Sequence, residues 1–235
     1  MNIKGIIVRV TPFKEKSAMV NLLTEDKLIS FLARDIFKIN NQNYLAATPL
    51  LCGEFNFVDN NDKTLIFKEV KPIIDIRMYI TDLNKLAAIN IINELTLRLF
   101  NDEDMPSVYP YLLKALKSLN EINHISVILS YLAVSLKLNG YGLIVDRCIY
   151  DESNKKLVGV SYIDGGLVCD ECFNKDQHLE YHLNLIKILQ HLFLINNPNT
   201  LFIEYPIEDA KKIFMDLIVY AEDQTGTKFK SKGLI

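Results

Sequence analysis

Three cysteines and an aspartate are spaced along the chain like the ligands of a zinc site. Cys169 and Cys172 form a Cys-x-x-Cys knuckle, and Cys148 and Asp151 have the same spacing earlier in the chain. Two knuckles roughly 15 to 20 residues apart are a zinc signature, and zinc accepts a carboxylate oxygen at nearly the distance of an imidazole nitrogen. We therefore predict a structural zinc site formed by Cys148, Asp151, Cys169 and Cys172, with the aspartate as its weakest ligand.

Two other interpretations of this cluster stay open. His178 follows Cys172 closely and competes as a fourth ligand, although with His182 it has the i,i+4 spacing of a solvated helix face. Alternatively, the cluster is the remnant of a metal site, in which the three thiols are kept as small buried hydrophobic groups. Catalytic zinc is disfavoured because the segment lacks the His-x-Glu and Pro-Cys-x-x-Cys pattern of zinc deaminases.

Nothing else in the sequence points to an enzyme. The four histidines have no serine or cysteine nucleophile at a recognisable spacing, and the sequence contains no glycine-rich phosphate loop. We therefore expect a protein without catalytic activity.

Cations and aromatic residues near the N-terminus indicate a second kind of chemistry. Phe13 and Phe37 lie in expected loops, where their rings could stack on nucleic-acid bases. The alternative is that these charges are solvated and that the rings close the end of the sheet. Lys228, Lys230 and Lys232 either extend the basic surface or belong to a frayed tail. The candidate phosphate contacts are Arg9, Lys14, Lys16, Arg34 and Lys38.

Short strands are expected to position the basic residues. Five runs rich in β-branched and aromatic residues precede residue 80, and polar turns such as 59–63 separate them. Five strands in about 70 residues fit an OB-fold, a barrel that commonly holds single-stranded nucleic acid. In the first strand Ile6, Val8 and Val10 should share one face, with Arg9 on the other. The predicted strands are 5–10, 18–23, 28–34, 53–58 and 64–70.

Helices are expected to position the cysteine cluster, because the apolar period changes after Pro72. Asp82 is the predicted cap of the first helix and Pro106 opens the second. The third is apolar nearly all round and is therefore expected to be buried. The predicted helices are 83–99, 106–119, 124–138, 177–195 and 207–223, which gives an α+β fold.

Composition is compatible with both sites without identifying either. The chain has 235 residues, no run of apolar residues long enough for a membrane helix, and no signal-peptide pattern. We expect a cytoplasmic protein, whose cysteines are reduced and available to a metal. Residues 1–80 contain 11 Lys and Arg against 9 Asp and Glu, whereas the remainder contains 15 against 20. This small basic excess makes a nucleic-acid partner possible but does not indicate one.

Several of these strings resemble one known family. The stretch GIIVRVTPFKEKSAMVNLLTEDKLISFLAR is similar to the N-terminal barrel of RecO-type recombination mediators, with its turn carrying Glu or Lys, Leu-Leu-Thr strand end and Ala-Arg string. LNGYGLIVDRC and GGLVCDEC resemble the helix end that leads into the family's four-cysteine zinc site. FKSKG resembles the family's basic C-terminal ending. Together these strings extend over most of the chain.

The resemblance implies a non-enzymatic protein of DNA repair and homologous recombination. Such a protein binds single- and double-stranded DNA, anneals complementary strands, and works with RecR to help RecA replace the single-stranded-DNA-binding protein. The implied location is the bacterial cytoplasm, at the nucleoid and away from membranes. The implied domains are an OB-fold nucleic-acid-binding domain at 1–80 and a mainly helical domain at 81–235, with a degenerate zinc-finger-like insertion at about 141–176.

Two departures from the family pattern lower the expected affinities. Asp151 occupies a position where a second cysteine is usual, and the segment DIFKINNQN after Arg34 lacks the usual dense Arg and Lys. Two alternative functions stay open: an RNA-binding OB protein, and a protein-interaction adaptor without nucleic-acid binding. Salt-dependent binding would distinguish the adaptor, and a comparison of DNA with RNA would separate the other two.

Overall fold

The computed structural model describes residues 1–38, 42–60, 64–79 and 81–235. These residues form two compact units, Met1–Lys117 and Ser118–Ile235. The strands of the first unit end before residue 80, but this unit continues to Lys117, so it contains helices as well as a sheet. Residues 61–63 of the predicted turn at 59–63, and residues 39–41 of the segment that follows Arg34, lie outside the described residues.

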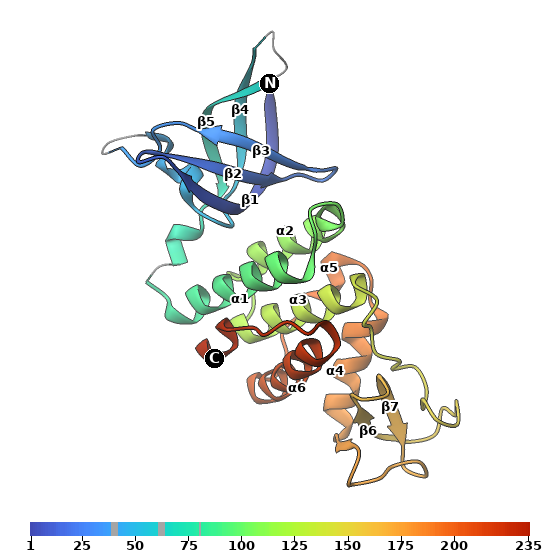
Figure 1. The fold of residues 1–235 in the computed structure, drawn as a ribbon. Helices are drawn as coiled ribbons and strands as arrows, with labels where there is room; N and C mark the ends of the chain where they lie inside the picture. Colours follow the sequence, from blue (N-terminus) through green and yellow to red (C-terminus); the bar gives the residue numbers. More distant parts are fainter. Residues whose placement is uncertain (39–41, 61–63, 80) are drawn as a thin grey trace. The chain divides into compact units, whose positions relative to one another are not determined.

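A five-stranded antiparallel sheet fills the N-terminal part of the first unit (Figure 1). Its order is β3-β2-β1-β4-β5, and four phenylalanines form the centre of its core. Phe31 of β3 lies 5.0 Å, between ring centroids, from both Phe57 of β4 and Phe67 of β5, so the two edge strands approach one another. Closure of the sheet into an OB barrel stays a prediction. The strands are β1 (Asn2–Phe13), β2 (Ser17–Leu23), β3 (Leu28–Ala33), β4 (Cys52–Asn60) and β5 (Thr64–Ile74).

A β-bulge in β1 changes which of its residues face the core. Ile7 pairs with Leu22 and Arg9 with Asn21, so Val8 is the extra residue between two consecutive pairs. Ile7 consequently belongs to the core cluster with Val10 packed against it, and the predicted common face of Ile6, Val8 and Val10 is wrong. Arg9 nevertheless points away from the core, as predicted. Residues paired across two strands share a face of the sheet, and Arg9 pairs with the polar Asn21, whereas Ile7 pairs with the buried Leu22.

Two helices complete the first unit. Asp82 caps α1 (Leu83–Leu99) as predicted, since its carboxylate accepts hydrogen bonds from the backbone N–H groups of Asn84 and Lys85. This helix packs against β1. The second predicted helix begins as a 3₁₀ turn, Met105–Val108, which contains Pro106 and leads into α2 (Tyr109–Ser118).

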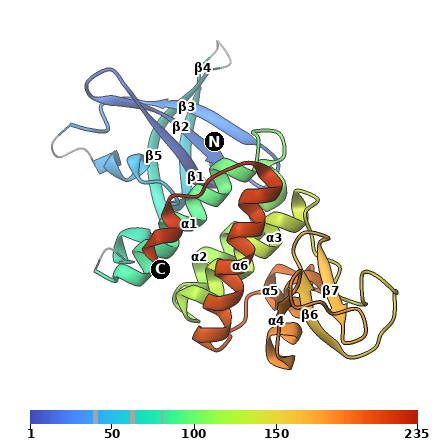
Figure 2. The same ribbon diagram turned by 60° about the horizontal axis from the view of Figure 1, so that its bottom comes forward.

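The second unit is built around α3 (His124–Leu138), which is buried at every position from Ile125 to Leu136, as the sequence predicted. Figure 2 shows α3 beside α6 (Ile207–Thr225), and α4 (Leu183–Leu194) packs against both. Asn123 caps α3 by accepting from Ser126 N–H, and its amide donates to the carbonyl of Tyr205 ahead of α6. A short helix, α5 (Pro198–Leu201), connects α4 to this segment.

A small sheet carries the cysteine cluster. Its strands are β6 (Leu157–Ser161), β7 (Gly166–Cys169) and β8 (Leu179–Glu180), in the order β7-β6-β8. Glycine is required at Gly166, because a Cβ there would lie 2.2 Å from Ile149 and 2.6 Å from the carbonyl oxygen of Ile144. The close approach lets the loop before the hairpin bond to it: Ile144 N–H donates to Gly165 O, and Leu167 N–H donates to Ile144 O.

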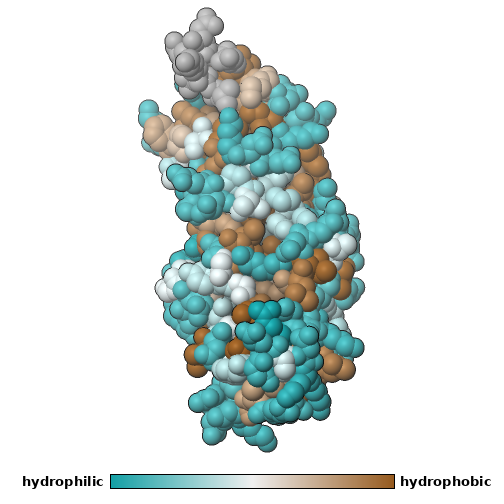
Figure 3. All heavy atoms as spheres, turned by 90° about the vertical axis from the view of Figure 1, so that its right-hand side faces the viewer, coloured by the Kyte–Doolittle hydropathy of each residue, from teal (hydrophilic) through white to brown (hydrophobic). Residues whose placement is uncertain are grey.

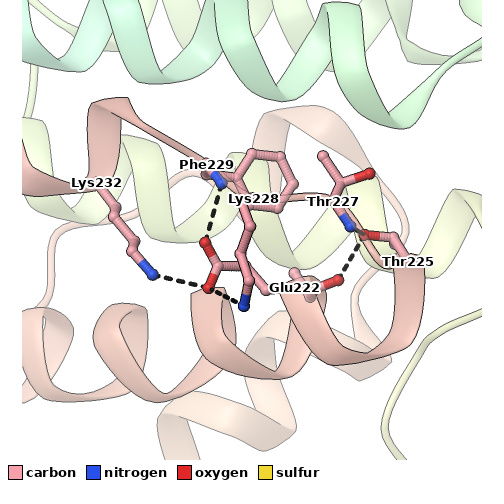
Figure 4. A network of polar contacts seen from close by, with 7 residues as sticks. Glu222, Thr225, Thr227, Lys228, Phe229 and Lys232 are labelled. Atoms are coloured by element: carbon pink, nitrogen blue, oxygen red, sulfur yellow. Dashed lines mark hydrogen bonds and ion pairs between the residues drawn. The ribbon is translucent and has the colours of Figure 1, made fainter.

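The C-terminal segment is fixed to α6 by one buried carboxylate (Figure 4). Glu222 is 4% exposed, and its oxygens accept from the backbone N–H of Phe229 at 2.9 Å and from the ammonium groups of Lys232 at 2.7 Å and Lys228 at 3.2 Å. Gly226 ends the helix in the left-handed conformation that turns the chain back. Phe229 is buried, so the frayed tail considered from the sequence is wrong.

The helices bury apolar faces within their units. Among the described residues, no helix is both long enough and apolar enough to cross a membrane. On the face shown in Figure 3, apolar side chains reach the surface in small groups among hydrophilic ones.

Candidate functional site

The structure brings the four predicted zinc ligands together. One donor atom from each of Cys148, Asp151, Cys169 and Cys172 lies within 4.8 Å of the other three. Cys169 Sγ is 3.7 Å from Asp151 Oδ2, a separation that suits neighbouring ligands of a tetrahedral zinc ion. Cys148 and Cys169 are buried, Cys172 is half-buried and Asp151 is exposed, so the cluster is open to solvent on its carboxylate side.

Two tight turns present these ligands. In the first knuckle Glu152 N–H donates to the carbonyl of Cys148, while Cys148 N–H donates to that of Ser153. This turn brings Asp151 back over Cys148. In the second, Cys169 ends β7 and the chain turns immediately to Cys172. Val168 and both buried cysteines form a small apolar core beneath the cluster.

Hydrogen bonds within the cluster favour the anionic forms of Asp151 and Cys169. The side chain of Ser153 lies near the Asp151 carboxylate, and the backbone N–H of Ser153 donates to Asp151 Oδ1 at 3.1 Å. Together with the thiols of Cys148 and Cys169, these contacts lower the pKa of Asp151 to about 2. Burial acts to raise the pKa of Cys169, but the N–H of Cys172 and the neighbouring thiols outweigh it and lower that pKa. Burial and the adjacent thiols raise the pKa of Cys172 to about 12. Within the second knuckle, therefore, Cys169 loses its proton more readily than Cys172.

His178 is engaged elsewhere. Its Nδ1 accepts from Asn174 N–H at 3.0 Å, and its Nε2 lies 2.8 Å from the hydroxyl of Tyr150. The ring is 6% exposed and precedes β8, because the predicted helix at 177–195 begins only at Leu183. The solvated helix face predicted for His178 and His182 is therefore wrong. Tyr150 was not singled out from the sequence, although its place between two predicted ligands was a signal.

The donor set fits zinc better than the other common protein metals. Thiolates select zinc over magnesium and calcium, which take oxygen ligands, and three sulfurs with one carboxylate complete a four-coordinate shell. A shell filled by protein ligands leaves no position for a substrate or a reactive water. The arrangement can therefore hold a structural ion, and its carboxylate is the weakest and most accessible ligand.

The first unit gathers a second group of predicted residues. Asp35 N–H donates to Ser17 Oγ and Phe37 N–H donates to the carbonyl of Lys16, both at 3.2 Å, so the β1–β2 turn and the loop after β3 lie together. Phe13 and Phe37 are 42% and 45% exposed. We call this group the loop surface; it consists of Phe13, Lys14, Lys16, Arg34 and Phe37.

The predicted cations differ in how they are paired. Arg9 lies 3.9 Å from Asp102, and Lys38 lies 3.0 Å from Asp35. The Lys14 ammonium lies 5.4 Å from the ring centroid of Phe13, a cation–π contact. Arg34 is exposed and makes no ion pair or hydrogen bond within the described part of the chain. Arg34 is therefore more readily available to a phosphate than Arg9 or Lys38.

Two lysines of the basic tail, the segment with Lys228, Lys230 and Lys232, are already paired with an acidic residue. Lys228 and Lys232 both pair with the buried Glu222 of the second unit. The sequence suggested a possible extension of the basic surface, but these two charges already neutralise a carboxylate of their own unit.

Comparison with known proteins identifies the family. The family model described as the C terminal of recombination protein O matches residues 80–232, well over half of the chain. DNA repair protein RecO of Bacillus subtilis (strain 168) is 26% identical over 99% of this chain and 92% of its own length. The RecO proteins of Bacillus pumilus (strain SAFR-032) and Rhodopirellula baltica (strain DSM 10527 / NCIMB 13988 / SH1) are each 28% identical over 74% of this chain, and over 69% and 68% of their own lengths.

The family match and the near full-length similarity agree with the strings that first suggested the resemblance, which lie in both units. The chain belongs to the RecO family of DNA repair proteins.

Proposed function

We propose that this protein is a recombination mediator that binds single-stranded DNA on the loop surface and anneals complementary strands. Its RecO relatives are named DNA repair proteins, which supports the DNA repair role. The proposal extends to double-stranded DNA, to RecR as a partner, and to helping RecA replace the single-stranded-DNA-binding protein. No step in it requires a catalytic residue.

One observation carries the DNA-binding proposal. The hydrogen bond from Phe37 N–H to Lys16 O joins two loops and places exposed aromatic rings beside exposed cations. Non-specific single-strand binding needs this combination, because cations follow the phosphate backbone while rings stack on bases of any sequence. The proposed phosphate contacts are Lys14, Lys16 and Arg34, with Arg9 and Lys38 as secondary contacts because each already has an acidic neighbour.

The test is a salt titration of single-strand binding. The double variant Lys16→Ala and Arg34→Ala should flatten the slope of log affinity against log salt by roughly 1.4, since each phosphate contact contributes about 0.7 on single strands. Lys4→Ala is the matched control: it removes one exposed charge from β1, at a position paired opposite Glu54 and outside the loop surface. Equal slopes in all three proteins would remove the loop surface from the function.

The same titration separates the alternatives. Absence of salt-dependent binding to any nucleic acid would favour the adaptor. Tighter binding to RNA than to DNA of the same sequence would favour an RNA-binding role, because the 2′-hydroxyl is what distinguishes the two.

We also propose that the cysteine–aspartate cluster binds one structural zinc ion. The gathered donor atoms support this proposal, as does the four-cysteine zinc site that the resemblance implies for the family. Elemental analysis should find about one zinc per chain. A metal-free protein whose melting temperature is unchanged by Cys148→Ser would instead establish the remnant interpretation.

A further inference from the structure

Tyr150 connects the two knuckles through groups that are not ligands themselves. Its hydroxyl donates to Asp164 Oδ2 at 2.6 Å and lies 2.8 Å from His178 Nε2. Tyr150 is in the first knuckle, between Cys148 and Asp151. Asp164 is in the β6–β7 turn, and His178 follows the second knuckle. One hydroxyl therefore links the first knuckle to the β6–β7 turn and to the segment that follows the second knuckle.

The direction of each hydrogen bond in this network is fixed by its partners. Asn174 N–H donates to His178 Nδ1, so the neutral ring carries its proton on Nε2 and donates it to the Tyr150 oxygen. Tyr150 then donates to Asp164, which also accepts from Ser161 Oγ at 2.7 Å. The hydrogen bonds from Tyr150 and Ser161 lower the pKa of Asp164, so it accepts as a carboxylate.

Packing holds the same residues in place. His178 is buried and contacts two rings, with centroid distances of 5.4 Å to Tyr150 and 5.8 Å to Phe173. Phe173 directly follows Cys172 and packs on the small core of the cluster. Among the non-ligand residues, Lys155 and Glu171 also link the two knuckle segments, but theirs is an exposed ion pair and is therefore weak.

We propose that Tyr150, His178 and Asp164 are positioning residues that hold the two knuckles in the arrangement that metal binding requires. This inference rests on the proposed zinc site. Without these contacts, the three thiols and the carboxylate, which lie on separate turns, would have to be ordered as the ion binds. The entropic cost of that ordering would reduce the affinity for zinc. Groups outside the ligand shell that orient ligands typically change metal affinity by 10- to 100-fold when they are lost.

The test compares two tyrosines of the same insertion. Tyr150→Phe removes the hydroxyl and keeps the ring. Tyr162→Phe is the matched control, because its hydroxyl bonds to Tyr181 at 3.0 Å and contacts neither knuckle. Zinc affinity of the full chain is measured by competition with a chelator, and cobalt(II) absorbance reports thiolate coordination. Tyr150→Phe should bind zinc at least about tenfold more weakly than wild type, whereas Tyr162→Phe should bind as wild type does.

A rescue series separates positioning from folding. His178→Leu removes the donor to Tyr150 and should weaken zinc binding, while His178→Gln offers an amide N–H in its place and should restore part of the affinity. The melting temperature of each metal-free variant shows whether it remains folded. Wild-type zinc affinity in Tyr150→Phe, with or without a lower metal-free melting temperature, overturns the positioning role and leaves the zinc site standing. Failure of the wild-type chain to bind zinc overturns both.

Discussion

Asp151 decides how tightly the cluster can hold a metal. The three sulfurs are buried or half-buried, but the carboxylate is exposed and is the one oxygen donor among the four residues of the cluster. A pKa of about 2 keeps it ionised at neutral pH, so it needs no proton release to bind a cation. It is nevertheless a harder and more hydrated ligand than a thiolate, which predicts a zinc site weaker than one with four cysteines.

The first prediction follows from this difference. Asp151→Cys should raise zinc affinity by at least about tenfold, because it supplies a fourth thiolate at a place where the carboxylate already approaches Cys169. Competition with a chelator measures the change. Asp176→Cys is the control, since it adds an exposed thiol to the same loop region outside the cluster. Zinc affinity that rises equally in both variants, or in neither, would show that position 151 is not a ligand.

A second prediction at this scale ranks two arginines that the sequence did not distinguish. Arg34→Ala should reduce the slope of log affinity against log salt by about 0.7, the value for one phosphate contact on a single strand. Arg9→Ala should reduce it by less, because Asp102 competes with the phosphate for the guanidinium. Affinity should fall to a similar extent for different sequences, because phosphate contacts carry no base information. A larger loss of slope from Arg9→Ala than from Arg34→Ala would reverse the ranking.

At the scale of elements, the attachment of the C-terminal segment to α6 depends on a charged group. Burial acts to raise the pKa of Glu222, but hydrogen bonds from Lys232, from the N–H of Phe229 and from Lys228 outweigh it and bring the pKa to about 2. A carboxyl whose folded pKa is depressed contributes stability above its unfolded pKa of about 4.3, and that contribution is lost as pH falls through the folded pKa.

The third prediction uses this pH dependence. At neutral pH, Glu222→Gln should lower the free energy of unfolding by about 1 to 3 kcal/mol, because it removes a buried charge that three donors contact. The difference from wild type should shrink as pH falls from about 4.3 toward about 2, where the wild-type carboxyl is protonated too. Denaturant unfolding at a series of pH values measures it. Asp223→Asn, a neighbouring exposed acid on the same helix, should change stability little at any of these pH values.

The main elements could be predicted because their signals are local. The Asp82 cap, the apolar positions of α3 and the five strands each depend on residues close together in the chain. The face of β1 was mispredicted because a bulge depends on the partner strand, which alternation within one strand does not reveal. The tail was mispredicted for a similar reason: Phe229 and Lys232 are held by Glu222, several residues away across a reversal at Gly226.

At the cysteine cluster, too, the features with local signals were predicted and those that depend on distant residues were not. The knuckle spacing predicted the cluster because each pair of ligands lies within one turn. His178 was placed on a helix because its i,i+4 relation to His182 is helical, but pairing of β8 with β6 takes this segment into a sheet. The Tyr150–Asp164 and Tyr150–His178 bonds join residues 14 and 28 positions apart, which no local pattern could indicate.

At the scale of the whole molecule, charge and chemistry divide between the two compact units. The first unit has 15 Lys and Arg against 14 Asp and Glu, and the second has 11 against 15. The loop surface belongs to the first unit, whereas the cysteine cluster and the basic tail belong to the more acidic second unit. The two proposed sites therefore lie in different units, the DNA contacts in the first and the metal cluster in the second.

The most direct test of the account is the rate at which complementary single strands anneal. A mediator that binds strands through the loop surface should accelerate annealing, and the acceleration should decrease as salt rises, because phosphate contacts are screened. The double variant Lys16→Ala and Arg34→Ala should lose most of this acceleration, while Lys4→Ala keeps it. The account would be contradicted by wild-type protein that leaves the annealing rate unchanged, or by a double variant that anneals strands as fast as wild type.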